Sequence, residues 1–503
     1  MDTSNATHDL IKYAEAIKAN ERNYRAWLGM ARCLQKMGRT DEALKPILCA
    51  LVFADQDDDP YKKGLHFLAE NKSLLHKTGA VLVELLGDIS HARVIILKLS
   101  QYANEHRNYD RDIAIRLMRL AWELDRSNRL MRSMLVKALL TEFRYAPIIE
   151  ILGNTAHSDL STDEARILSA ARACTEAAAN VERLNAISLD RNLDLETRAQ
   201  ALRRSVVTWR LNSKAAEMIN YRQSRYMDYP MYLHLETLAR CNAACSFCPY
   251  PGLERKGERM PDELVYKILG DLRAIPKDLP FKIAPFKVSD PFLEKRLFDI
   301  IDYAAEHLPS ASIVLITNGA AMTDRSLERL LACKNIERVS ISLNDHRPDH
   351  YEGLMKIPFS RTIERMRALH ALVERGECKF EVLVTRVIDG SAADILFREW
   401  VRAEFPRFQV GLAPRNDWIG QMDLETSADA VPDVGCNRWF MMSITATGKV
   451  ALCCMDGEEK YVVGDASQQH IIDIYNLPSY RVMRETLDSR KAAAPPCNGC
   501  TYA

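Results

Sequence analysis

The spacing of apolar side chains changes along the chain and divides it into three parts. Over residues 1–225 the apolar positions recur at helical spacing, without any long strand-like alternation. From residue 230 onward, short apolar runs alternate with amphipathic helical stretches. We therefore predict an α-helical domain at 1–228, an α/β domain at 229–430 and a small α+β domain at 431–503. The first boundary lies where Pro230 and its neighbours interrupt the helical pattern.

Six short apolar runs predict strands in the middle part, at 232–238, 281–286, 312–316, 338–343, 379–384 and 407–412. Amphipathic stretches predict helices between them, at 262–274, 291–307, 324–332, 360–375 and 392–404. Strands that alternate with helices pair in parallel, and right-handed crossovers curl such a sheet. Ligands of these sheets collect at the carboxyl ends of the strands, so we expect the functional residues there.

The helical part contains a segment with the residue spacing of a protein-interaction repeat. Trp27, Ala31, Gly38, Ala43 and Ala50 resemble one tetratricopeptide repeat, in which small residues let two antiparallel helices pack closely. We expect two to four weak repeats. They form either a concave surface for a peptide or partner protein, or a cap that buries one face of the α/β part. We interpret the basic residues near the end of this part as a solvated helix face rather than a docking patch: Arg203, Arg204, Arg210, Lys214, Arg222 and Arg225.

Composition narrows the class of protein. The 503 residues carry no formal net charge, which gives no indication of a nucleic-acid or anionic-membrane partner. No signal peptide is visible and no run of about 18 apolar residues occurs, so we expect a cytoplasmic protein that does not enter a membrane. Thirteen cysteines in such a chain indicate metal ligands and buried thiols rather than disulfides.

Three of these cysteines follow the first predicted strand at the spacing CxxxCxxC: Cys241, Cys245 and Cys248. Three thiolates suit a [4Fe–4S] cluster whose fourth iron stays open, whereas structural zinc and closed clusters take four protein ligands. The run, including the aromatic Phe247, resembles the cluster loop of the radical S-adenosylmethionine (SAM) enzymes. The resemblance implies a partial (β/α)6 barrel and Phe247 beside the cofactor. It also implies that the open iron binds SAM, whose reductive cleavage gives a 5′-deoxyadenosyl radical. A zinc or structural cysteine site is the alternative.

The same resemblance indicates contacts to SAM after the following strands. Asp290 stands where the family usually has a Gly-Gly-Glu-Pro run, and its carboxylate would accept from the SAM ammonium; its alternative role is a helix N-cap. Thr317 and Asn318 would line the cavity, although Asn-Gly also forms turns. Ser342 would reach the SAM carboxylate or ribose. Arg386 would pair with the SAM carboxylate or an acidic substrate, unless it is a surface residue.

The C-terminal part contains a second cysteine group. Cys436, Cys453, Cys497 and Cys500 lie on separated segments that a hairpin near residue 448 would bring together. The pattern resembles the SPASM extension of the same family, especially its shorter twitch form. This resemblance implies one auxiliary [4Fe–4S] cluster held by these four cysteines, with Cys454 as an alternative to Cys453. A zinc site is the alternative.

These observations lead to one expected function and several alternatives. We expect a radical SAM enzyme with two [4Fe–4S] clusters that oxidises or crosslinks a peptide or protein, using an electron donor such as flavodoxin or ferredoxin. Arg415 and Asn416 are the expected substrate contacts. The alternatives are a dehydrogenase or epimerase of a sugar or cyclitol, and a binding module with a degenerate radical domain, which the missing glycines before Asp290 favour. An epimerase needs a thiol hydrogen donor, for which Cys454, Cys333 and Cys378 are candidates.

Overall fold

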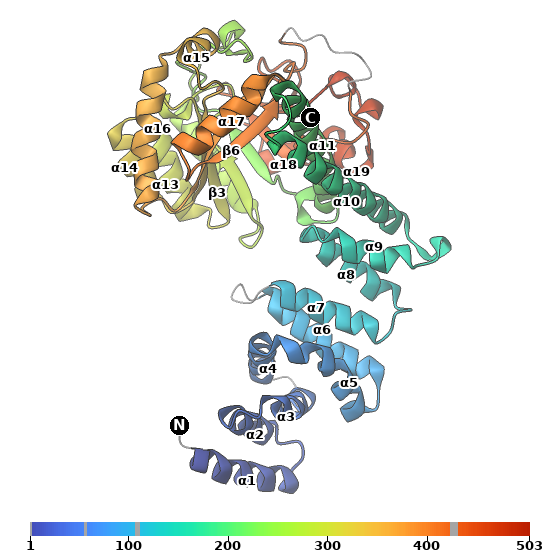
Figure 1. Cartoon of the computed structure of the whole chain (residues 1–503). Coiled ribbons are helices and arrows are strands. Elements are labelled where there is room, and N and C mark those ends of the chain that lie inside the picture. Colours follow the sequence, from blue (N-terminus) through green and yellow to red (C-terminus); the bar gives the residue numbers. More distant parts are fainter. Residues whose placement is uncertain (1–2, 55–57, 106–110, 423–430, 503) are drawn as a thin grey trace. The chain divides into compact units, whose positions relative to one another are not determined.

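The computed structural model describes residues 3–54, 58–105, 111–422 and 431–502. The chain folds into two compact units, Met1–Ala171 and Arg172–Ala503 (Figure 1). The expected helical domain at 1–228 therefore spans the whole first unit and the beginning of the second. The expected boundary at residue 430 lies outside the described residues. None of the described helices combines the length and the apolar character that a membrane span requires.

The first unit is built from helices that pack against their neighbours in sequence, as predicted (Figure 1). In the pair formed by the helices at Tyr24–Lys36 and Thr40–Val52, the residues Ala31, Ala43 and Ala50 are fully buried and let the two helices approach closely. Gly38 has a φ of +75° in the turn between them, a conformation that favours glycine. The helices are α1 (Thr3–Ala19), α2 (Tyr24–Lys36), α3 (Thr40–Val52), α4 (Asp58–Glu70), α5 (Leu75–Leu86), α6 (Ile89–Glu105), α7 (Arg111–Glu123), α8 (Arg129–Thr141), α9 (Tyr145–Gly153) and the start of α10 (Thr162–Leu189).

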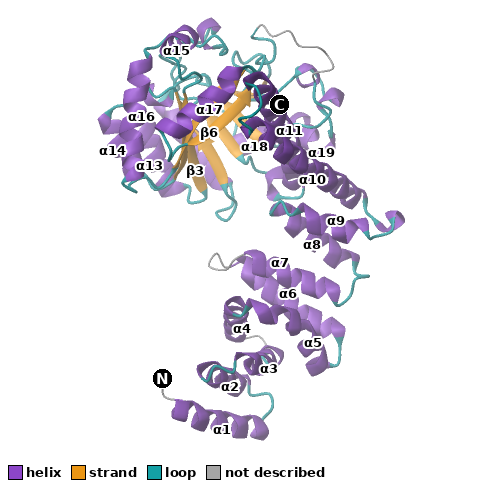
Figure 2. Ribbon diagram, viewed as in Figure 1, coloured by secondary structure: helices purple, strands orange, loops and turns teal. Residues whose placement is uncertain are grey.

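The second unit is organised around one sheet in the order β6-β5-β4-β3-β2-β1-β7-β8-β9. The first six strands pair in parallel, and helices surround them (Figure 2). The predicted six-unit partial barrel is therefore confirmed. Its strands are β1 (Tyr232–Leu235), β2 (Phe281–Ala284), β3 (Ala311–Thr317), β4 (Ile336–Ser342), β5 (Glu381–Ile388) and β6 (Gln409–Pro414).

The helices of this unit lie between and around the strands (Figure 2). α15 was not predicted; it starts with a proline at its first position, where the missing N–H costs nothing. The predicted helix at 291–307 is divided into a short 3-10 turn, Pro291–Leu293, and α13. The helices are α11 (Leu195–Arg222), α12 (Asp262–Asp271), α13 (Leu297–His307), α14 (Asp324–Ala332), α15 (Pro348–Met355), α16 (Phe359–Glu374), α17 (Ala392–Glu404), α18 (Ile471–Tyr475) and α19 (Pro478–Thr486).

The barrel strands present alternate faces. Leu233 and Leu235 of β1 are fully buried in the core that the surrounding helices share, whereas Tyr232 and His234 point to the opposite face. The C-terminal part continues the sheet instead of forming a separate one, because β7 (Met441–Ile444) pairs in parallel with β1. The strands β8 (Lys449–Ala451) and β9 (Val462–Asp465) then follow as an antiparallel meander.

The basic residues of α11 do not form the solvated face that we expected. The Lys214 side chain is only 6% exposed and its ammonium lies 3.4 Å from the centroid of the Tyr502 ring. Arg222 donates to the backbone carbonyls of Arg484 and Leu487. That prediction was wrong for these two residues, because α11 docks on the C-terminal part of its own unit. Arg203 and Arg204 are exposed, as expected.

Candidate active site

The loop that carries the first three cysteines begins at the carboxyl end of β1 and is fastened by its backbone. The amides of Ala244 and Ser246 each donate to carbonyls at the end of α15, those of Met355 and Leu354, at 3.1 Å. The Cys248 amide donates to the Cys245 carbonyl at 3.1 Å. The loop therefore has a fixed course before any metal binds.

The three thiols of this loop are partly buried and close enough to influence one another. Burial raises the pKa of Cys241 to about 12 and that of Cys248 to about 11, and burial also raises the pKa of Cys245. The neighbouring thiolates add to the rise for Cys241 and Cys245. Three thiolates at this place therefore need a positive partner, which the irons of a cluster supply as the thiols lose their protons. The residues present fit a three-thiolate cluster.

Asp290 links the loop after β2 to the loop after β3. Its own amide donates to the carbonyl of Arg240, the residue before Cys241. One carboxylate oxygen accepts from the Phe292 amide at 3.0 Å, which makes Asp290 the N-cap of the short turn that follows. The other oxygen accepts from the Thr317 hydroxyl at 2.8 Å and from the Asn318 amide at 3.0 Å. Burial raises the pKa of Asp290. Its alternative role as a cap is therefore present, and the carboxylate is committed to its own chain.

Asn318 extends this connection to the cysteine loop. Its side-chain amide donates to the side-chain oxygen of Asn242 at 2.7 Å and lies 3.9 Å from the Cys241 sulfur. On β4, the Ser342 hydroxyl accepts from the side-chain amide of Asn344 at 2.7 Å. The structure thus brings the loops after β2 and β3 against the loop that carries Cys241.

Arg386 has different partners from those we expected. Its guanidinium is 3% exposed and forms ion pairs with Asp394 at 2.7 Å and with Asp345 and Asp389 at 3.2 Å. These carboxylates and the backbone carbonyl of Asn344 occupy its hydrogen-bond donors. Arg386 therefore holds the loop after β4 against the loop after β5, and its geometry does not favour a contact with a cofactor.

The segment that we expected to border the substrate lies against the cysteine loop. The Trp418 indole donates to the Phe247 carbonyl at 3.1 Å, and Arg415 approaches the Ser246 carbonyl at 3.5 Å. The side-chain oxygen of Asn416 is buried and has no hydrogen-bond partner within the described residues. An unpaired acceptor beside the loop is available to a ligand.

Glu236 is a residue of this region that the sequence reasoning missed. It is fully buried at the end of β1, where its carboxylate accepts from the Val288 amide at 3.1 Å, from the Ala446 amide at 3.3 Å and from the Arg255 guanidinium. It therefore ties the start of the cysteine loop to the loop after β2 and to the C-terminal hairpin. A charged residue that ends an apolar strand was the available signal.

A second group of cysteines lines one enclosed cavity in the C-terminal part. Cys436, Cys453, Cys497 and Cys500 all face it, whereas Cys454 is not among its lining residues. The Arg438 guanidinium instead contacts the Cys454 sulfur. Among the described residues, no three His, Cys, Asp or Glu side chains stand close enough to hold a single metal ion.

Two arginines that the sequence reasoning missed also line this cavity. Arg490 is 1% exposed and has a buried Nη2 without a hydrogen-bond partner, and the buried Nε of Arg438 is likewise unpaired within the described part of the chain. The positive charge of both side chains beside the cavity would stabilise an anionic group held there. A thiolate-bound iron–sulfur cluster is such a group, so the residues present fit one.

Comparison with known proteins gives two family matches. Residues 235–394 match the model of the Radical SAM superfamily, and residues 436–501 match the model of an iron-sulfur cluster-binding domain, SPASM. The chain is 20% identical over 269 residues to the S-adenosyl-L-methionine-dependent 2-deoxy-scyllo-inosamine dehydrogenase of Niallia circulans. That match covers 53% of this chain and 91% of the dehydrogenase.

Two solved structures are similar at low sequence identity. The crystal structure of BtrN in complex with AdoMet and 2-DOIA is 18% identical, with a TM-score of 0.41, and the match covers 54% of this chain and 93% of BtrN. Streptococcus suis SuiB bound to precursor peptide SuiA is 13% identical, with a TM-score of 0.43, and the match covers 59% of this chain and 75% of SuiB.

Proposed function

We propose that this chain, whose residues 235–394 match the model of the Radical SAM superfamily, catalyses a net two-electron oxidation of a peptide or protein, or forms a crosslink in it. It is a SAM-dependent iron–sulfur enzyme with a SAM-binding [4Fe–4S] cluster and auxiliary cluster binding in its C-terminal domain. When bound, these cofactors supply the electron that cleaves SAM and the radical that removes hydrogen from an unactivated carbon.

The observation that carries this proposal is the cavity that holds four cysteines together with Arg438 and Arg490. Four thiolates would leave an auxiliary cluster without an open iron, so it would not bind substrate directly. The guanidinium groups of the buried Arg490 and the half-buried Arg438 favour the more negative, reduced form of a cluster beside them. Such a site suits an electron acceptor, which an oxidation requires and a redox-neutral epimerisation does not.

We assign the protein's own groups to positioning. Asp290 and Asn318 hold two strand-end loops against Cys241, which fixes the space where SAM would meet the first cluster. Arg415, which approaches this loop, and its neighbour Asn416 are the proposed substrate contacts. We propose Cys436, Cys453, Cys497 and Cys500 as the auxiliary ligands, because they share a cavity and Cys454 does not. We also propose a cytoplasmic location and a flavodoxin or ferredoxin as the electron donor, since free thiols and clusters need reducing surroundings.

The alternative substrate is a cyclitol. The relative from Niallia circulans is named for the dehydrogenation of 2-deoxy-scyllo-inosamine, and the match covers 91% of that enzyme but only 53% of this chain. The chain has, in addition, a helical unit at Met1–Ala171. We favour a peptide or protein because a unit of this kind suits a long ligand.

The first experiment tests the chemistry without knowing the substrate. The full chain is reconstituted anaerobically, and iron and 5′-deoxyadenosine are measured after addition of SAM and dithionite. We expect about eight irons per chain, as two cubane clusters require, and formation of 5′-deoxyadenosine. A protein with full clusters that forms none would refute the proposal and favour the binding module.

A second experiment separates the two substrate classes and the two outcomes. The reconstituted enzyme is incubated with 2-deoxy-scyllo-inosamine, and the product mass is followed in H₂O and in D₂O. Loss of two hydrogens would identify the cyclitol dehydrogenase and contradict the peptide assignment. Unchanged mass in H₂O with one deuteron gained in D₂O would indicate epimerisation instead. In that case a thiol must return the hydrogen atom, and Ala variants of Cys333, Cys378 and Cys454, the three candidates, would show which of them is the donor.

A further inference from the structure

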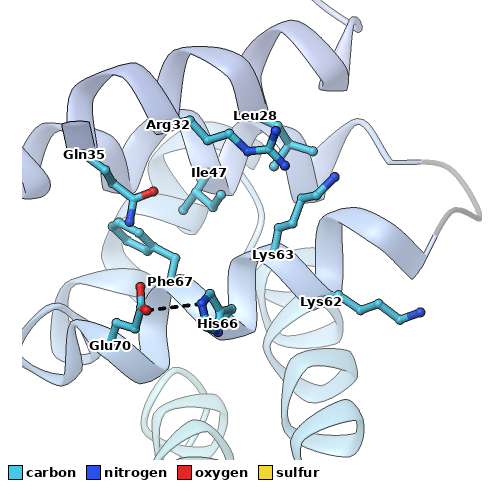
Figure 3. Close-up of a pocket in the computed structure, with 9 residues that line it drawn as sticks. All are labelled: Leu28, Arg32, Gln35, Ile47, Lys62, Lys63, His66, Phe67 and Glu70. Carbon is cyan, nitrogen blue, oxygen red and sulfur yellow. Dashed lines mark ion pairs between the residues drawn. The ribbon is translucent and has the colours of Figure 1, made fainter. Parts of the chain in front are cut away.

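The groove between α2 and α4 contains a polar contact of the ordinary, exposed kind. His66 and Glu70 are exposed and lie 3.2 Å apart, whereas the apolar Leu28 and Phe67 of the same groove are buried (Figure 3). Water competes for such a contact, which therefore contributes little. The end of α15, in the other unit, has a polar contact of a different kind, because it is buried next to the first cysteine group.

Met355 is the last residue of α15, and its thioether faces Cys245. The two sulfur atoms, Sδ of Met355 and Sγ of Cys245, are 3.5 Å apart, and Met355 is only 1% exposed. The backbone carbonyl of Met355 also accepts from the Ala244 amide at 3.1 Å. Main chain and side chain of Met355 therefore both contact the cysteine loop, and together they fix the thioether against Cys245.

Asn344 holds the same thioether in place. Its side-chain amide donates to the Met355 sulfur at 3.2 Å and to the Ser342 hydroxyl at 2.7 Å, and its side-chain oxygen accepts from the Val387 amide at 2.9 Å. Asn344 is buried and has a φ of +64°, in the left-handed region that Asn adopts more readily than most residues. The position of the Met355 sulfur is therefore set by β4 and β5 as well as by its own helix.

The neighbours of Cys241 and Cys245 differ in what they can donate. The Cys241 sulfur accepts from the Ala243 amide at 3.4 Å and lies 3.9 Å from the side-chain amide of Asn318. The Met355 thioether beside Cys245 has no hydrogen to donate, and its burial keeps water from that side of the sulfur. Hydrogen bonds to the sulfurs of an iron–sulfur cluster and exposure to water raise its reduction potential, because they stabilise the more negative, reduced form.

We propose that Met355 is a positioning residue that keeps hydrogen-bond donors from one side of the Cys245 sulfur and so holds the first cluster at a low reduction potential. A cluster of lower potential is a stronger reductant, and an electron from this cluster is what cleaves SAM. The inference rests on the proposed function, because it requires the first cysteine group to hold a cluster.

The test measures the midpoint potential of the first cluster in the reconstituted full chain, by redox titration with EPR detection. The EPR signal that changes when SAM is added identifies that cluster. Met355→Gln places an N–H donor beside Cys245 and should shift the potential to a more positive value. Met355→Leu places no donor there and should leave the potential within the scatter of repeated titrations. Met366→Gln makes the same polar change at a buried methionine of α16 and should also leave it unchanged.

A second measurement does not depend on the stability of a polar variant. The full chain is labelled with selenomethionine enriched in the magnetic isotope of selenium, reduced, and examined by pulsed EPR. A selenium atom in contact with Cys245 should give a hyperfine coupling to the first cluster, and this coupling should be absent from Met355→Leu. If Met355→Gln does not assemble the first cluster, the selenium coupling decides.

Three results would overturn the assignment. They are an unchanged potential in Met355→Gln, a shift of the same size in Met355→Leu or Met366→Gln, and a labelled chain without the selenium coupling. A chain without a first cluster would instead show no SAM-dependent EPR signal at all, which would refute the proposed function itself. The failure of the Met355 assignment and the failure of the proposed function are therefore distinguishable.

Discussion

The two cysteine groups of Arg172–Ala503 are built in opposite ways. Cys241, Cys245 and Cys248 stand on one loop whose backbone is already fastened to α15. The second group, by contrast, comes from separated segments of the C-terminal part, where the hairpin of β7 and β8 continues the barrel sheet. The first group therefore stands on one short segment, and the second requires several segments to meet.

Their electrostatic surroundings differ as well. Beside the first group lies the buried Asp290 carboxylate, whose negative charge adds to the effect of burial in raising the pKa of Cys241. Two arginines line the second cavity. Negative surroundings disfavour an added electron and positive surroundings favour it. The difference indicates that the first site expels electrons and the second receives them.

The largest effect is expected from a substitution that disrupts the first cysteine group alone. Cys245→Ala should abolish 5′-deoxyadenosine formation and lower the iron content from about eight to about four per chain, since one cluster loses a thiolate. Iron analysis and chromatography of the reaction measure both. Cys333→Ala, a buried cysteine outside both groups, is the control and should change neither value. Retained SAM cleavage in Cys245→Ala would disprove the assignment.

The second largest effect is expected from substitutions that disrupt the second cysteine group. Cys497→Ala combined with Cys500→Ala should also remove about four irons, but the enzyme should still cleave SAM, because the first cluster is untouched. Product formation should stop while 5′-deoxyadenosine still accumulates. Loss of SAM cleavage in this variant would show that the two sites do not work separately.

A third change asks whether Arg386 is scaffold or cofactor contact. Arg386→Met leaves the buried Asp394 without its cation and Asp345 with Arg347 alone, which should cost about 3–5 kcal/mol and lower the melting temperature by roughly 5–10 °C. Arg347→Met, which removes a more exposed partner of Asp345, should cost less than about 1 kcal/mol. A stable Arg386→Met protein with weakened SAM binding would restore our original expectation of a SAM contact.

The smallest effect is expected in the reduction potential of the second cluster, and it tests whether the positive charge beside that cluster matters. Arg490→Met should lower the reduction potential of the second cluster, because it removes a buried positive charge from the lining of the cavity. As a scale, a unit charge at a separation of about 8 Å and an effective dielectric constant of about 20 contributes about 2 kcal/mol, which for one electron is on the order of 90 mV. Spectroelectrochemistry with EPR detection measures the shift, and Arg490→Lys, which keeps the charge, is the control. An unchanged potential in Arg490→Met would remove the argument for an electron acceptor.

The features that could be predicted from the sequence are those that follow from the order of neighbouring residues. The features that were missed follow from contacts between residues that are distant in the sequence. The six strands and the cysteine loop could be predicted because alternation and spacing are local properties. Arg438 and Arg490 could not, since a buried arginine looks like a surface arginine until its neighbours are known. Lys214 was misassigned for the same reason: the helical pattern of α11 does not reveal that Tyr502, distant in sequence, covers it.

The parallel pairing of β1 with β7 has a practical consequence for shortened forms of the protein. Tyr232 to Leu235 lie in register with Met441 to Ile444, so β7 covers what would otherwise be the open edge of the barrel. A chain cut before residue 431 would leave that backbone free to pair with other molecules, and such edges promote self-association. The C-terminal part thus protects the barrel edge from self-association, and this structural role is independent of any role in electron transfer.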